Sequence, residues 1–142
     1  MKRIFTDIAA AALIASILLT AAGCGAESSS DVDIDLTRMS ATMVYSEVFD
    51  MTYKPKEYAG KTIRMNGIFS AAFDEEKQDI RYACIIQDAT QCCAQGVEFE
   101  LAEIPEEYPQ GGSYVTVTGV YDSYELNGEP YGIVRNAVFE EE

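Results

Sequence analysis

Three cysteines and two carboxylates lie close together in the middle of the chain. The cysteines are Cys84, Cys92 and Cys93, and the carboxylates are Asp88 and Glu98. Thiolate sulfur suits zinc and copper(I), and three sulfurs with one carboxylate oxygen complete a tetrahedral set of ligands. A soft-metal site, with zinc as the candidate ion, is therefore one interpretation of these residues, although C-x7-C-C is not a standard zinc motif.

The same cysteines support two other interpretations, and a structural disulfide is the favoured one of the three, because an oxidising location outside the cytoplasm favours disulfides. A disulfide from Cys84 to either Cys92 or Cys93 would leave one spare thiol, and closing so short a loop would add about 2–3 kcal/mol to the stability. Thiol–disulfide exchange by Cys92 or Cys93 is the least favoured of the three, because a reactive thiol needs a nearby cation or helix N-terminus. Asp88 and Glu98 would raise the thiol pKa, and no C-x-x-C motif is present.

Composition narrows the classes of function. The chain has no histidine, which excludes serine-type triads, proton transfer by imidazole and histidine-ligated zinc. The formal net charge is −14, so the basic surface that nucleic-acid binding requires is missing. We expect a non-enzymatic binding domain, for which cations, cationic peptides and uncharged partners remain open.

Tyrosines form a second candidate surface. Tyr121, Tyr124 and Tyr131 cluster around a hairpin turn predicted at Asn127 and Gly128. They could form a ligand or partner surface. Cross-strand packing is the favoured interpretation, because tyrosine suits half-buried strand positions.

The elements that must position these residues are mainly β. Helical spacing predicts one helix over residues 40–51, with Ser40 as its cap. Period-two patterns and turn signals predict five strands, over residues 62–69, 80–87, 97–101, 113–124 and 131–139. Five short strands with bend glycines favour a small OB-like closed barrel, capped by the N-terminal helix and forming one domain over residues 37–139. An open meander packed on the helix is the alternative.

The N-terminal segment carries an export pattern. Lys2 and Arg3 precede an apolar run over residues 8–19, and small residues lead to Cys24. This order resembles a bacterial lipoprotein signal over residues 1–23. The resemblance implies diacylglycerol on Cys24, acylation of the new N-terminus (a palmitate-type modification) and a lipid anchor on the extracytoplasmic face of the cell membrane. An uncut helix is the alternative, but the apolar run is shorter than the ~20 residues that span a bilayer.

Two segments flank the predicted domain. Residues 24–36 are small, polar and acidic, so we expect a flexible tether between the lipid and the domain. Residues 140–142 are three glutamates, for which we expect a solvated acidic tail.

Three stretches, at residues 58–67, 88–99 and 115–119, carry a family resemblance. The chain is similar to small OB-like lipoproteins of Gram-positive, largely clostridial, bacteria whose function is not established. More distantly it resembles the extracytoplasmic domain of permease-associated membrane proteins of unknown function. The resemblance implies an accessory role near a membrane transporter or envelope protein. The corresponding positions are Lys61, Gly67, Cys92, Cys93 and Gly119.

Overall fold

The computed structural model describes residues 32–75 and 77–140. The signal segment 1–23, Cys24 and residues 25–31 of the expected tether lie outside this range, as do residues 141–142 of the expected tail. Within the described part of the chain, no helix has both the length and the apolar character that a bilayer crossing requires.

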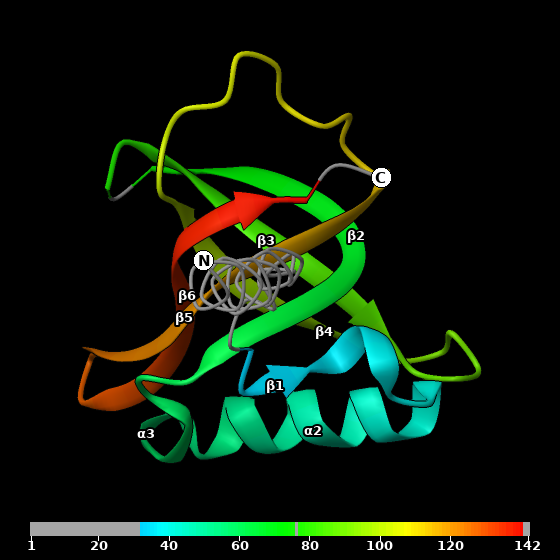
Figure 1. Ribbon diagram of the computed structural model, residues 1–142. Helices are drawn as coiled ribbons and strands as arrows, with labels where there is room; N and C mark the ends of the chain where they lie inside the picture. Colours follow the sequence, from blue (N-terminus) through cyan, green and yellow to red (C-terminus); the bar gives the residue numbers. More distant parts are fainter. Residues whose placement is uncertain (1–31, 76, 141–142) are drawn as a thin grey trace, which may run out of the picture. The chain divides into compact units, whose positions relative to one another are not determined.

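Five strands close into a barrel (Figure 1). They pair in the order β2-β3-β4-β6-β5, and β5 then pairs with β2. The β4–β6 pair is parallel and the other four pairs are antiparallel. The predicted OB-like closed barrel is thereby confirmed, and the open meander is excluded because β5 returns to β2. The strands are β2 (Thr62–Asp74), β3 (Asp79–Gln87), β4 (Ala94–Leu101), β5 (Tyr114–Leu126) and β6 (Glu129–Phe139).

Strand β2 closes the barrel by changing partners midway. Ile68 is opposite Tyr114 of β5 at the end of one ladder and opposite Ile85 of β3 at the start of the next. Gly67 sits beside this crossover, where an added Cβ would lie 2.7 Å from the Cys84 sulfur. Only glycine allows the two strands to approach this closely.

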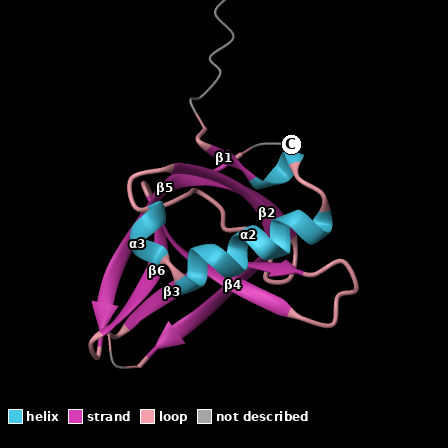
Figure 2. Cartoon of the chain, turned by 90° about the horizontal axis from the view of Figure 1, so that it is seen from below, coloured by secondary structure: helices cyan, strands magenta, loops and turns pink. Residues whose placement is uncertain are grey.

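A helix covers one end of the barrel, as predicted. Helix α2 (Ala41–Tyr53) and the short α3 (Pro55–Tyr58) lie across that end (Figures 1 and 2). Val48 and Met51 of α2 are fully buried against the strands. Ser40 occupies the N-cap position, but its side chain makes no capping hydrogen bond. The 101–114 connection between β4 and β5 lies at the opposite end of the barrel (Figure 1) and holds no helix.

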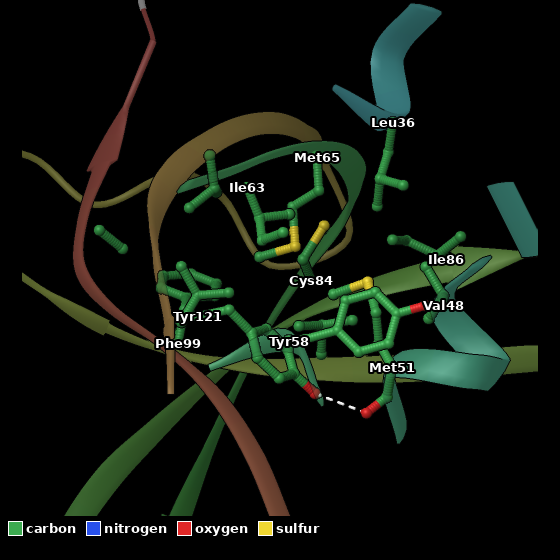
Figure 3. Packing of buried hydrophobic residues seen from close by; sticks show 14 of the residues in the cluster. Leu36, Val48, Met51, Tyr58, Ile63, Met65, Cys84, Ile86, Phe99 and Tyr121 are labelled. Carbon is green, nitrogen blue, oxygen red and sulfur yellow. Dashed lines mark hydrogen bonds between the residues drawn. The ribbon is translucent and has the colours of Figure 1, made fainter. Parts of the chain in front are cut away.

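Alternation along the strands fills the interior. The core includes Ile63, Met65 and Phe69 of β2, together with Val97 and Phe99 of β4 (Figure 3 shows part of the cluster). These are the residues that the period-two pattern places on the inner face. The predicted strand pattern therefore also identifies the core.

The ordered domain extends beyond the predicted boundaries. Strand β1 (Ile34–Asp35) pairs with β2, and the 3-10 turn η1 (Leu36–Arg38) follows it. Leu36 is only 2% exposed, so the predicted tether is wrong for residues 34–36. The expected tail is also wrong at residue 140, because Glu140 is paired with the Arg64 guanidinium and accepts from the Thr118 hydroxyl at 2.6 Å.

Candidate metal centre

The loop over residues 88–93, between β3 and β4, is tightly turned. The Asp88 N–H donates to the Cys93 carbonyl at 2.9 Å, and the Gln91 N–H donates to the Asp88 carbonyl at 3.0 Å. Gln91 adopts a φ of 59°, a left-handed conformation that lets the chain reverse. The turn brings the side chains at both of its ends to the same place.

The Asp88 carboxylate organises this loop. Its Oδ1 accepts from the backbone N–H groups of Thr90 at 3.2 Å, Cys92 at 3.0 Å and Cys93 at 3.4 Å. Its Oδ2 accepts from the Thr90 hydroxyl at 3.0 Å and the Cys92 thiol at 3.4 Å. Aspartate is suited to such local bonds to the backbone that follows it.

Three potential ligand atoms converge as a result. One carboxylate oxygen of Asp88 and the sulfurs of Cys92 and Cys93 all lie within 4.8 Å of one another. The Cys92 sulfur is 3.6 Å from the Cys93 sulfur and 3.4 Å from Asp88 Oδ2. Tetrahedral zinc, about 2.3 Å from each sulfur and about 2.1 Å from the oxygen, would separate two sulfurs by about 3.8 Å and a sulfur from the oxygen by about 3.6 Å. The two separations from the Cys92 sulfur are within a few tenths of an ångström of these values.

The loop sets the protonation of two of these groups. Burial opposes ionisation of Asp88, but hydrogen bonds from Thr90, the Cys92 thiol and the backbone outweigh it and hold the carboxyl pKa below its usual value. The hydrogen bond with Cys92, then the charges of Cys92 and Asp88 together with slight burial, raise the pKa of the Cys93 thiol. At neutral pH the site therefore has an ionised carboxylate and a Cys93 thiol that must lose its proton to bind a metal.

Cys84 is not part of this group. Its side chain is fully buried and points into the core near Ile63 and Met65 (Figure 3). Burial raises the pKa of its thiol to about 12. All three cysteines of the described chain are free thiols. The expected convergence of three sulfurs at the end of the hairpin is thus reduced to two, because Cys84 has the parity of the inward-facing residues on β3.

Glu98 also lies elsewhere. It is on the outer face of β4, where its carboxylate is paired with the Arg81 guanidinium and accepts from the Tyr124 hydroxyl at 2.9 Å. Arg81 also bonds Asp74 at 3.2 Å. These partners make Glu98 a member of a surface ion-pair network, separate from the cysteine loop.

A small pocket adjoins the loop. It has a volume of about 270 Å3 and is lined by Ala41 and Val44 from the first turn of α2 and by Asp88 and Gln91 from the loop. The start of α2 is distant from the cysteines in sequence. In the folded chain, the start of α2 faces the loop.

The tyrosines of the last hairpin divide between two roles. Tyr124 and Tyr131 are register partners on β5 and β6, with ring centres 5.8 Å apart in a stacked arrangement. Tyr121 is buried, and its hydroxyl donates to the Met51 carbonyl at 2.8 Å. Cross-strand packing thus accounts for one pair, and attachment of the helix accounts for the third ring.

No protein-family model matches the chain, and no curated protein matches it significantly. The resemblance to clostridial lipoproteins therefore stays an expectation based on the quoted residues.

Proposed function

We propose that this protein is a lipid-anchored, extracytoplasmic binding domain that holds a soft metal ion, zinc or copper(I), in its 88–93 loop. The observation that carries the metal proposal is the convergence of the Asp88 carboxylate with the Cys92 and Cys93 sulfurs. Thiolates select zinc and copper(I) over harder ions. The anchor rests on the N-terminal pattern that ends at Cys24.

Three protein ligands leave one coordination position for a fourth group. Both cysteines are exposed, so water or a side chain of another protein can reach that position. Structural zinc sites usually use four protein ligands, whereas an exposed ion with three leaves a position at which a ligand atom of another protein can replace water, as exchange of the ion requires. Such exchange agrees with the accessory role beside a membrane transporter that the family resemblance implies.

Thiol–disulfide exchange is the alternative function, and the loop chemistry disfavours it. Exchange requires an attacking thiolate, yet the surroundings of Cys93 raise its pKa. Cys84, buried in the core, is poorly placed to resolve a mixed disulfide. A raised thiol pKa matters less for metal binding, because the metal itself displaces the proton.

The test is metal stoichiometry in matched variants. The starting protein carries Cys24→Ser, so that the N-terminal thiol cannot contribute. Adding Cys92→Ser and Cys93→Ser should abolish stoichiometric zinc or copper(I) binding, whereas adding Cys84→Ala should leave it intact. Unchanged stoichiometry in the double serine variant would rule out the site.

A further inference from the structure

A second surface feature lies at the barrel end away from α2. The β3–β4 ladder ends at the pair Tyr82 and Phe99. Beyond it, residues 79–81 of β3 pair with β2, while Leu101 of β4 is opposite Ala137 of β6. The two strands therefore diverge, and a groove of about 530 Å3 opens between them, bordered also by the 101–114 connection.

The walls of this groove carry exposed apolar side chains. Ile80 is 49% exposed, Ile104 is 86% exposed and Tyr108 is 42% exposed, and all three line the groove. The Tyr108 ring stacks on Tyr82 with ring centres 5.5 Å apart, which holds the connection against the barrel. Apolar side chains gathered on an otherwise strongly charged surface mark interaction sites.

The arginines of the groove are already neutralised. Arg81 is paired with Asp74 and Glu98, and Arg135 is paired with Glu100 and Asp122. An anionic ligand would have to break these pairs to reach a guanidinium. The groove thus disfavours phosphate, carboxylate and nucleic acid as ligands.

Carboxylates without an ion pair complete the lining. Among the described residues, Asp79 and Glu103 line the groove and make no salt bridge. Of the described cationic residues that line the groove, Lys77 makes no salt bridge. Its amino group lies 5.5 Å from the centre of the Tyr124 ring. With a net charge of −14 on the whole chain, the field at this surface favours a cationic partner.

We propose that this groove binds an extended segment of a second protein in which basic and bulky apolar side chains alternate. Residues 79–81 of β3 pair with β2 on one side but not with β4 on the other. A strand from a partner can therefore pair with this free side of β3. Alternate side chains of a strand face opposite sides. Apolar side chains then contact Ile80 and Ile104, and basic side chains reach Asp79 and Glu103.

The experiment uses the full-length protein in phosphatidylcholine nanodiscs, with empty nanodiscs as the blank. The probe is a short fluorescein-labelled peptide of alternating lysine and isoleucine, followed by fluorescence anisotropy. Control peptides replace lysine by glutamate, or isoleucine by serine. We expect saturable binding of the first peptide, weakened by added salt, and at least about tenfold weaker binding of both controls. Equal binding of the glutamate peptide, or no binding of the lysine peptide, would overturn the proposal.

Variants locate the binding site. Ile104→Ser combined with Glu103→Lys should weaken binding at least about tenfold, and both side chains are exposed, so the fold should persist. Glu57→Lys makes the same charge change on α3, away from the groove, and should have little effect. Equal weakening by Glu57→Lys would reduce the interaction to non-specific charge attraction. Binding of a neutral oligosaccharide such as chitohexaose in place of the peptide, or self-association through these residues, would also overturn the proposal.

Discussion

The Tyr121 hydroxyl donates a hydrogen bond of 2.8 Å to the Met51 carbonyl and so joins β5 to α2. The ring of Tyr121 fits where residue 132 has no side chain, since a Cβ there would lie 1.8 Å from the hydroxyl oxygen. The contact explains how a helix that precedes the barrel in sequence is fixed across its end.

Tyr121→Phe should lower the free energy of unfolding by about 1–2 kcal/mol, because the Met51 carbonyl loses a hydrogen bond that Pro55, which has no N–H, cannot supply. Urea unfolding followed by circular dichroism measures this change. Tyr131→Phe is the matched control, since Tyr131 is 46% exposed and should change stability by less than about 0.5 kcal/mol. Equal effects of the two variants would contradict the role given to Tyr121.

Substitutions of Asp88 and Glu98, the two carboxylates of the predicted ligand set, should affect different properties. Asp88→Asn keeps an oxygen acceptor for the loop N–H groups but removes the anionic ligand, so zinc affinity should fall about tenfold or more. Glu98→Gln should leave zinc affinity unchanged and lower stability by about 1 kcal/mol, because Arg81 loses a partner. Competition with a chromophoric chelator measures the first effect, and urea unfolding measures the second. A loss of affinity in Glu98→Gln alone would reverse the assignment.

Zinc affinity should rise with pH through the neutral range. The Cys93 thiol has a raised pKa, so its proton is still bound at neutral pH and must be released when zinc binds. Each unit of pH increase should strengthen binding up to about tenfold per proton released. The lowered pKa of Asp88 keeps this carboxylate ionised there, so it adds no pH dependence. Calorimetry in buffers of different ionisation enthalpy counts the protons. A flat profile from neutral to alkaline pH would contradict thiolate ligation.

The proposed lipid anchor on Cys24 can be tested separately from the metal site. Growth with labelled palmitate should label the wild-type protein and place it in the membrane fraction, whereas Cys24→Ser should remain unlabelled. Recovery of both proteins with the leader attached and without label would contradict the lipoprotein assignment.

Much of the fold could be predicted because it follows local rules. Period-two patterns and turn signals located the five strands, and the closed barrel followed from the number and length of these strands. Local patterns carry no information on the change of partner at Ile68 or the burial of Leu36. Both depend on segments that are distant in sequence.

The candidate site was only partly predictable, for the same reason. Proximity in sequence grouped Cys84 and Glu98 with the 88–93 loop, but strand parity directs Cys84 inward and Glu98 outward. The alternation of the strand residues could have shown that Cys84 faces inward and Glu98 outward. The groove between β3 and β4 could not have been predicted from the sequence, because it depends on where the two strand ladders end.

The most direct test of the metal proposal is zinc-edge X-ray absorption on the Cys24→Ser protein loaded with one equivalent of zinc. We predict two sulfur ligands at about 2.3 Å, with the remaining positions filled by oxygen at about 2.0–2.2 Å. A zinc shell of oxygen alone would contradict this prediction.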